Sequence, residues 1–448
     1  MEFREFVKLL ESKGMLTRIT KQVDSEYEIS TLIKLLDGKP LLFEKVKGYD
    51  MPVIANICVS RDLVALGLGV ERLKLIPYVA NAIDHPKKYE VDEATDYVDI
   101  GTDLTKLPIL TYYRCDGGRY FSSAIAIAQD KEYGLNASYH RAMMFKKKDK
   151  AGNDVDELET DKLVLRILER DLDAYIKRGL NEFAFCVGNS IQVLVGAAIS
   201  AAIDVDEMQI ANAMAPTKMV RLGGHVVPNS EIVMIMEFTG EEHEEGKFVD
   251  LTETVDIIRM QRVARVKHIF VRRGAMFQAL LPGGLEHKVL MGMPREPTMY
   301  TEVGKVTEVK DVLVTPGGTS WLHGVVSIKK RHPDDGINAI HAAFKGHKSM
   351  KHVFIVDDDI DINDPNQVEW AMATRFQGKR GMVMFEDKGS SLDPSSDMAT
   401  RLTTKIGFDL TIPPEEKPKE GETKKPKKEF QKPPLPLQLK VGDYLPKK

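Results

Sequence analysis

The chain has 448 residues, of which 43% are hydrophobic and 29% are charged. This composition is ordinary for a folded globular protein, and the length favours two or three domains. The net charge of −4 at pH 7 gives no reason to expect nucleic acid or an anionic membrane as the main partner. The three cysteines, Cys58, Cys115 and Cys186, form neither a zinc pattern nor a disulfide framework, which fits a reducing cytosol.

No segment has the features of an export signal or of a membrane span. Residues 1–6 lack the basic and then apolar pattern of a signal peptide. The longest apolar run, residues 191–203, is too short and too interrupted to cross a bilayer. We therefore expect a cytoplasmic protein without a membrane partner.

The first section, residues 1–105, is predicted to be a mixed α/β domain. Apolar side chains recur at helical spacing from Phe3 to Leu10, and Gly14 then ends the helix. Short apolar runs bounded by turn residues predict strands, and a longer periodic run predicts a second helix. These later elements are expected at residues 41–43, 53–55 and 61–83.

The middle section, residues 106–304, is rich in predicted strands, interrupted by two largely helical stretches. The strands are expected at 122–128, 182–187, 232–238 and 266–271, and the helices at 161–177 and 188–214. The lysine-rich segment 146–154 is predicted to be a hairpin tip or an exposed loop. Its lysines are expected in solvent, with contact to an anionic substrate as the alternative.

The third section, residues 305–412, is again predicted to be α/β. Its strands are expected at 306–314, 324–328 and 353–356, and its helices at 336–344 and 366–374. The acidic triplet Asp357–Asp359 could indicate a metal site, but we favour a helix-entry loop in which carboxylates cap backbone N–H groups. The Lys/Pro-rich tail, residues 413–448, is predicted not to order itself, although its Leu and Tyr side chains could dock on another subunit.

Many short strings, in the same order along the chain, resemble the UbiD family of decarboxylases that use a prenylated flavin. The resemblance extends from Phe3 to about Thr411. It rests on residues 3–6, 40–44, 47–53, 230–233, 316–318, 328–330, 357–359, 370–375 and 405–409. It implies an α/β (α+β) fold with an N-terminal α/β section, a central split β-barrel that binds flavin, and a C-terminal α/β domain.

The resemblance also implies a proton-transfer site. Arg141 matches the central arginine of the family's acid–arginine–acid network, and Glu245 and Asp250 match its two carboxylates. A guanidinium beside two carboxylates holds one ionised and orients the other, which can then carry a proton to the carbon that CO₂ leaves. The remaining acids of the run 241–245 are expected in a solvated loop.

A metal site and a flavin-lining surface are implied by the same comparison. Asn136 and Glu207 match two metal ligands, and Asp171 stands where many members have a histidine. Carboxylate, amide and phosphate oxygens suit Mn²⁺ or Mg²⁺, and K⁺ is a further candidate ion. The residues that match the flavin-lining segments are Tyr139, His140, Arg141, Arg166, Ile167 and Leu168. Considered without the family, His140 is better explained as a hydrogen-bonded structural histidine.

The implied reaction is non-oxidative decarboxylation of a small-molecule carboxylic acid. Residues 282–287 and 291–297 look like the archaeal branch, in which trans-anhydromevalonate 5-phosphate becomes isopentenyl phosphate and CO₂ in an isoprenoid pathway. The alternatives are decarboxylation of a hydroxylated aromatic acid and a non-catalytic flavin-binding subunit. The expected partners are a flavin prenyltransferase, as cofactor supplier, and further copies of the chain, as a dimer or hexamer. Candidates for binding a substrate phosphate are His140, Arg295 and the lysines at 146–148.

Overall fold

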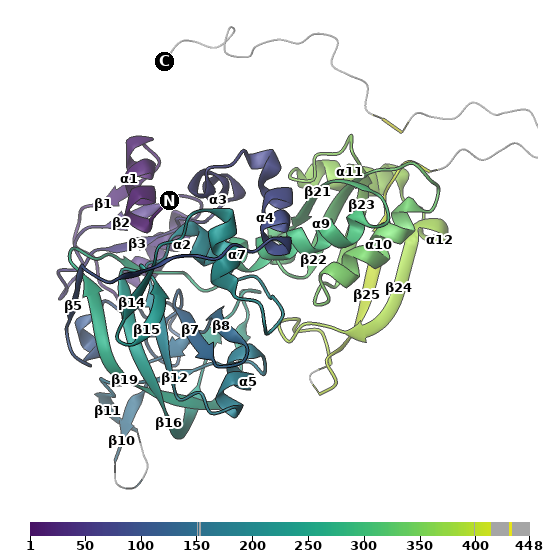
Figure 1. The fold of residues 1–448 in the computed structure, drawn as a ribbon. Coiled ribbons are helices and arrows are strands. Elements are labelled where there is room, and N and C mark those ends of the chain that lie inside the picture. The colour runs from purple at the N-terminus through teal and green to yellow at the C-terminus, as the bar shows by residue number, and fades with distance from the viewer. Residues whose placement is uncertain (150, 152–153, 398, 414–429, 432–448) are drawn as a thin grey trace, which may run out of the picture.

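The computed structural model describes residues 1–149, 151, 154–397, 399–413 and 430–431. The three largest sheets have nine, five and four strands. Figure 1 shows the five-stranded sheet with its helices on one side of the molecule, and a larger body that contains the other two on the other side. No helix among the described residues is long and apolar enough to span a bilayer. The predicted tail, residues 413–448, lies almost entirely outside the described residues.

The N-terminal section forms a four-stranded sheet with helices packed against it. The sheet has the order β1 (Thr17–Ile19), β2 (Leu41–Phe43), β3 (Val53–Ala55) and β20 (Phe277–Gln278). Its helices are α1 (Phe3–Ser12), α2 (Glu28–Leu35), α3 (Arg61–Leu68) and α4 (Leu75–Asp84). Helix α1 buries the apolar side chains that repeat at helical spacing along one face. The sequence-predicted strands at 41–43 and 53–55 are confirmed.

Several contacts join this section to later parts of the chain, and two of them involve its sheet and its first helix. Strand β20 adds to the sheet by pairing in parallel with β3, although more than two hundred residues separate them. Arg4 of α1 donates two hydrogen bonds to Glu231, at 2.8 and 3.0 Å, and that carboxylate is fully buried. The N-terminal section therefore depends on residues from the middle of the chain.

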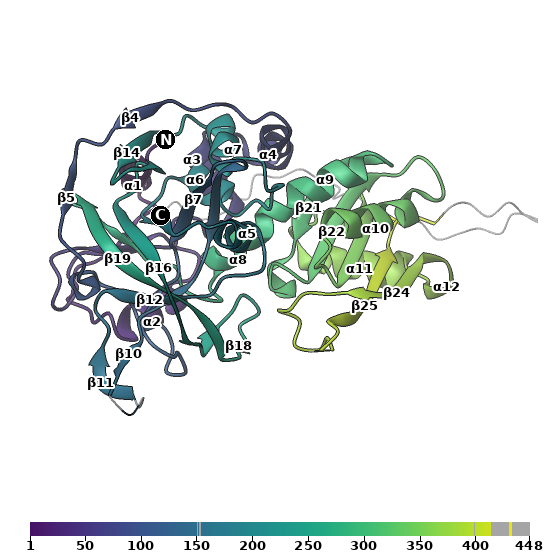
Figure 2. The same ribbon diagram turned by 60° about the horizontal axis from the view of Figure 1, so that its bottom comes forward.

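The central section is built on a nine-stranded sheet that curves into a half-barrel (Figure 2). The sheet order is β6-β9-β12-β19-β16-β13-β7-β8, with β5 (Tyr97–Asp99) also pairing with β19. Its two longest strands, β16 (Ile232–Glu245) and β19 (Arg259–Arg272), pair antiparallel. The others are β6 (Tyr120–Phe121), β7 (Ile125–Asp130), β8 (Gly134–Tyr139), β9 (Ala142–Met143), β12 (Lys162–Leu165) and β13 (Glu182–Val187).

The smaller elements of the central section complete this body. The lysines at 146–148 form strand β10 (Lys146–Lys148), which pairs with β11 (Asp154–Leu158), and the predicted tip lies partly outside the described residues. A three-stranded sheet combines β4 (Val91–Glu93), β14 (Met219–Leu222) and β15 (His225–Pro228). The helices are α5 (Asp171–Lys177), α6 (Ile191–Gly196), α7 (Glu207–Met214) and α8 (Leu285–Gly292), and β17 (Phe248–Val249) pairs with β18 (Val255–Asp256).

The C-terminal section is a three-layer α/β/α unit. Its sheet has the order β21 (Glu308–Val314), β22 (His323–Lys329), β23 (His352–Asp357), β25 (Leu402–Asp409) and β24 (Met382–Lys388). Helices α9 (Glu296–Gly304) and α10 (Asp335–Gly346) pack on one face, and α11 (Pro365–Arg375) packs on the other. A short helix, α12 (Gly378–Gly381), precedes β24. The elements predicted from the apolar runs in this section are all present.

Three helix predictions need correction. The segment 61–83 is two helices, because Gly69 ends α3 in a left-handed conformation at φ 71°. In the segment 161–177, Lys162–Leu165 is a strand held between β9 and β19, so pairing with distant strands overrides the local helical pattern. The segment 188–214 contains two short helices separated by residues 197–206.

The acidic triplet at 357–359 serves neither of the purposes considered above. Asp357 and Asp359 both accept hydrogen bonds from the fully buried Arg375, and Asp357 also accepts one from the backbone of Ile412. The following helix, α11, is capped by Asp364 instead. The expectation of a capping loop is therefore wrong, because a buried guanidinium needs these carboxylates as partners.

Candidate active site

Arg141 lies at the centre of a network of carboxylates, between strands β8 and β9. Its Nε and Nη2 atoms donate to the two carboxylate oxygens of Glu245 at 2.9 and 3.0 Å. Its Nη1 atom donates to Asp250 at 2.9 Å, and its guanidinium lies 4.4 Å from the centre of the Phe248 ring. The fold thus brings together the three residues that the sequence comparison had placed in one network.

Glu245 is the more enclosed of the two predicted carboxylates. Its side chain is 0% exposed, whereas that of Asp250 is 20% exposed. The hydroxyl of Tyr120 donates a further hydrogen bond to Glu245 at 3.1 Å. The acids at 241, 242 and 244 are exposed, as expected. They belong to strand β16, however, and not to a loop, because residues 242–245 pair with β19.

A third carboxylate, Asp256, completes the network and was not identified from the sequence. It accepts a hydrogen bond from Nη2 of Arg141 at 2.8 Å and another from Arg259 at 2.7 Å. Burial would raise the pKa of Asp256, but the two arginines outweigh burial and lower it. The pairing of β17 with β18 returns residue 256 to the site, and this pairing leaves no signal in the spacing of charged residues.

The charges around Arg141 reinforce its ionised state. Burial alone would lower the pKa of Arg141, but the carboxylates of Glu245, Asp250 and Asp256 outweigh burial and raise it. Arg166 lies nearby, and its pKa is lowered, first by burial and then by the charges of Arg259 and Arg141. Arg141 therefore stays ionised within this network.

The loop before strand β6 lies against this network. The backbone N–H of Gly117 donates to the carbonyl of Lys247 at 2.9 Å. Asp116 accepts hydrogen bonds from the backbone of Tyr112 and Tyr113, while its other carboxylate oxygen is buried without a hydrogen-bond partner in the described structure. Burial raises the pKa of Asp116 to about 6. The close approach at Gly117 couples this loop to the segment that follows Glu245.

The two residues proposed as metal ligands are adjacent and almost fully buried. Asn136 of β8 and Glu207 at the start of α7 are each 2% exposed. The Asn136 amide nitrogen lies 3.3 and 3.4 Å from the two Glu207 oxygens, one of which also accepts from the backbone of Ala137 at 2.9 Å. In the described structure, no cationic side chain pairs with Glu207.

The chemistry of this pair fits a hard divalent cation. Burial raises the pKa of Glu207 to about 8, so its carboxylate lies in surroundings that favour a positive partner. An amide oxygen and a carboxylate are ligands that Mn²⁺ or Mg²⁺ accepts, together with phosphate or water oxygens. The amide of Asn136 would have to turn, because its nitrogen now faces Glu207.

Asp171 is near this pair but does not form a compact ligand cluster with it. It begins helix α5 and is partly exposed, and its charge adds to the effect of burial in raising the pKa of Glu207. Across the part of the chain that the structure describes, no three His, Cys, Asp or Glu side chains gather closely enough to hold a metal ion. Ligation by Asp171 therefore stays a prediction.

The residues predicted to line the flavin differ in their surroundings. His140 is buried, and its two ring nitrogens contact the Arg166 carbonyl and the Ser138 hydroxyl, which agrees with a structural histidine. Burial lowers the pKa of His140 to about 4, so the ring is neutral at pH 7. Tyr139 donates to a backbone carbonyl of α6, Ile167 is buried and Leu168 is 49% exposed.

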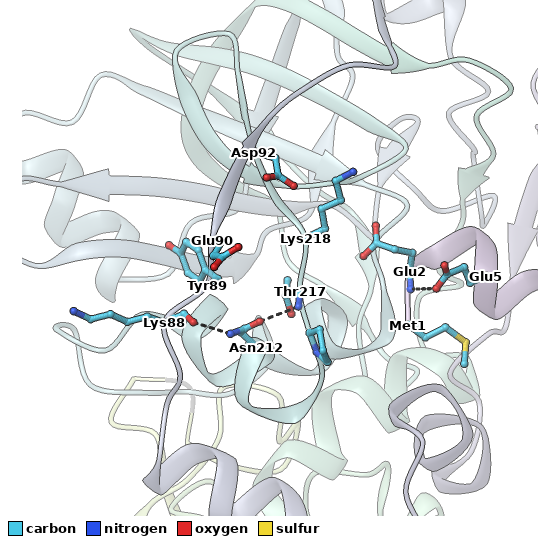
Figure 3. Close-up of a pocket in the computed structure, with 11 residues that line it drawn as sticks. Met1, Glu2, Glu5, Lys88, Tyr89, Glu90, Asp92, Asn212, Thr217 and Lys218 are labelled. Atoms are coloured by element: carbon cyan, nitrogen blue, oxygen red, sulfur yellow. Dashed lines mark hydrogen bonds between the residues drawn. The ribbon is translucent and has the colours of Figure 1, made fainter.

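A surface pocket of about 510 Å³ lies away from this network (Figure 3). It is lined by residues from the chain start, from the segment 88–92 and from the end of α7 and the residues after it. None of the sequence-predicted site residues lines it. The pocket is therefore separate from the candidate active site.

Comparison with known proteins assigns this chain to a family. The family described as 3-octaprenyl-4-hydroxybenzoate carboxy-lyase matches in three parts. Its N-terminal domain matches residues 7–83, its Rift-related domain residues 86–285 and its C-terminal domain residues 288–410. The chain belongs to the UbiD family and is a UbiD-type decarboxylase, which is a carboxy-lyase.

Individual relatives are similar over almost the whole chain. The anhydromevalonate phosphate decarboxylase of Methanocaldococcus jannaschii is 38% identical over 410 residues, covering 88% of this chain and 93% of the relative. The structure of the UbiD-class enzyme HmfF from Pelotomaculum thermopropionicum in complex with FMN is 32% identical, with a TM-score of 0.87, and covers 99% of this chain and 100% of that chain. An evolved dimeric form of HmfF in complex with prFMN is 32% identical, with a TM-score of 0.82, over 92% of this chain and 95% of that chain.

Proposed function

We propose that the chain uses prenylated FMN to convert trans-anhydromevalonate 5-phosphate to isopentenyl phosphate and CO₂. The observation that carries this proposal is the network of Arg141, Glu245 and Asp250, in a chain 38% identical to an enzyme named for that substrate. The FMN and prFMN complexes of HmfF support the cofactor. We include Mn²⁺ or Mg²⁺, with K⁺ as a further ion, in the proposal.

Each residue of the network has a different role in the proposed reaction. Arg141, held in place by three carboxylates, binds the substrate carboxylate and orients it through charge-assisted hydrogen bonds. Glu245, buried and held by two parallel hydrogen bonds, positions the guanidinium. Asp250 delivers the proton to the carbon that CO₂ leaves, because it is the more exposed acid of the predicted pair.

The other proposed groups bind the cofactor. Asn136 and Glu207, with Asp171 beside them, would hold the metal ion, and the segments at 139–141 and 166–168 would line the flavin. When bound, the prenylated flavin supplies an electron sink for the carbon that loses CO₂. A flavin prenyltransferase would supply this cofactor. We place the enzyme in the cytoplasm as a homo-oligomer.

The test is turnover by holoenzyme made with a flavin prenyltransferase and Mn²⁺. We expect CO₂ release from the phosphorylated acid, and solvent deuterium at the former carboxyl carbon in D₂O. Asp250→Asn should lose about 10² to 10⁴-fold in rate while it keeps bound flavin. Asn136→Ala and Glu207→Ala should instead lose flavin.

The outcomes separate the alternatives. Faster turnover of a hydroxylated aromatic acid would show that such an acid is the substrate. No turnover of either acid would favour a non-catalytic flavin-binding subunit. Full activity with unmodified FMN, or after exhaustive chelation of metal, would contradict the cofactor proposal. Near wild-type rate and deuterium exchange in Asp250→Asn would show that another group donates the proton.

A further inference from the structure

Two arginines from different sections of the fold converge on one serine hydroxyl. Nη1 of Arg170 donates to Oγ of Ser200 at 2.9 Å, and Nη2 of Arg295 donates to the same oxygen at 2.6 Å. Arg170 immediately precedes α5, Ser200 follows α6, and Arg295 immediately precedes α9 of the C-terminal section. The cluster therefore lies where the central and C-terminal sections meet.

This cluster has an excess of positive charge. In the described part of the chain, neither Arg170 nor Arg295 forms an ion pair with an acidic side chain, and Nε of Arg295 is buried without a hydrogen-bond partner. Burial, and then the charge of Arg170, lower the pKa of Arg295 to about 10. The two like-charged guanidinium groups repel each other, and a bound anion would reduce this repulsion.

The donors suit a phosphate monoester. Each guanidinium presents several N–H groups in a planar fork that matches phosphate oxygens. Ser200 accepts both arginine hydrogen bonds, so its own O–H remains available as a donor. The cluster also adjoins the candidate metal site in sequence and space, because Asp171 follows Arg170 and its charge acts on Glu207.

The other cations considered for substrate phosphate are less suitable. His140 is neutral, and both of its ring nitrogens are engaged. Lys147 pairs with Glu157 on the β10–β11 hairpin, which projects from the central section at the opposite end from α9 (Figure 1). Arg295 is the member of the earlier set that lies in a cluster of donors.

We propose that Arg170, Ser200 and Arg295 form a binding site for the phosphate group of a phosphate monoester. The group would come from the substrate or from the flavin, so this inference rests on the proposed function for its source. Phosphate binding at these residues does not depend on which acid the enzyme decarboxylates. It can also be measured without turnover.

The first experiment measures inorganic phosphate binding through Trp321. The Arg295 guanidinium lies 5.1 Å from the centre of that ring, and the chain has only one other tryptophan. In a Trp370→Phe background, phosphate should cause a saturable fluorescence change that chloride at equal ionic strength does not cause. The change should disappear in Arg170→Met/Arg295→Met and persist in Arg221→Met, an exposed arginine on β14.

The second experiment identifies the source with holoenzyme carrying Arg295→Met or Arg295→Lys. If the substrate supplies the phosphate, the preference for the phosphorylated over the dephosphorylated acid should fall at least tenfold, with flavin content unchanged. If the flavin supplies it, flavin content per chain should fall and the preference should remain. A phosphate response that matches chloride, or that survives in the double variant, overturns the proposal, whichever acid the enzyme decarboxylates.

Discussion

Replacing Gly117 by alanine should slow decarboxylation without removing any functional group. A Cβ at this position would lie 1.9 Å from the carbonyl oxygen of Gly246, 2.6 Å from its carbonyl carbon and 2.8 Å from the sulfur of Met143. Ordinary contact begins near 3.4 Å, so the loop and the segment after Glu245 must separate by about 1.5 Å. Displacements of about 1 Å can cost a factor on the order of 10² in rate.

The assay compares kcat, bound flavin and thermal unfolding of the variant and wild-type holoenzymes. We expect kcat to fall about 100-fold, since the network around Arg141 depends on the position of Glu245. Gly304→Ala is the matched control, because a Cβ at residue 304 has no neighbour within 4 Å. If Gly117→Ala keeps kcat within about twofold of wild type, the contact with Gly246 does not set the geometry of the site.

Three further predictions concern buried charge. Asp256→Asn should lower KM for the acid several-fold with little change in kcat, since it removes a negative charge that competes with the substrate carboxylate for Arg141. An unchanged KM would contradict this. Burial raises the pKa of Glu286 from 4.5 to about 7, so its contribution to stability is present below pH 4.5 and is lost as pH rises through 7. Glu286→Gln should therefore flatten the decline of unfolding free energy between pH 4.5 and 7. An equal slope in both proteins would show that other groups cause the decline. Arg375→Met should lower the free energy of unfolding, measured by chemical denaturation, by about 3–5 kcal/mol. Adding Asp359→Asn should recover part of this loss, and no recovery would show that the two residues act independently.

The spacing of apolar residues predicted those helices and strands whose buried face is defined by their own sequence. Helix α1 and strand β13 were expected from apolar spacing, and both are present close to the predicted bounds. The segment 161–177 failed because its first half is a strand between two partners that lie far away in the sequence. Such pairing is a tertiary effect, so it cannot be predicted from the neighbouring residues in the sequence alone.

The same distinction applies to the site. Arg141, Glu245 and Asp250 were identified because they match a family motif, and the fold places them in contact. Asp256 has no such motif, and it reaches Arg141 only through the register of two short strands. Tyr120 likewise comes from a separate strand, and its hydrogen bond to Glu245 could not be inferred from spacing.

The pairing of β20 with β3 has a consequence for how this protein can evolve. Residues 277–278 supply the edge strand of the N-terminal sheet, and Glu231 holds Arg4 from the middle of the chain. A recombination event that exchanged residues 1–105 alone would place β20 and Glu231 against the corresponding residues of another protein, and not against β3 and Arg4 of this chain. Exchange between relatives should therefore preserve the pair of segments, and chimaeras that swap both should fold where chimaeras that swap one do not.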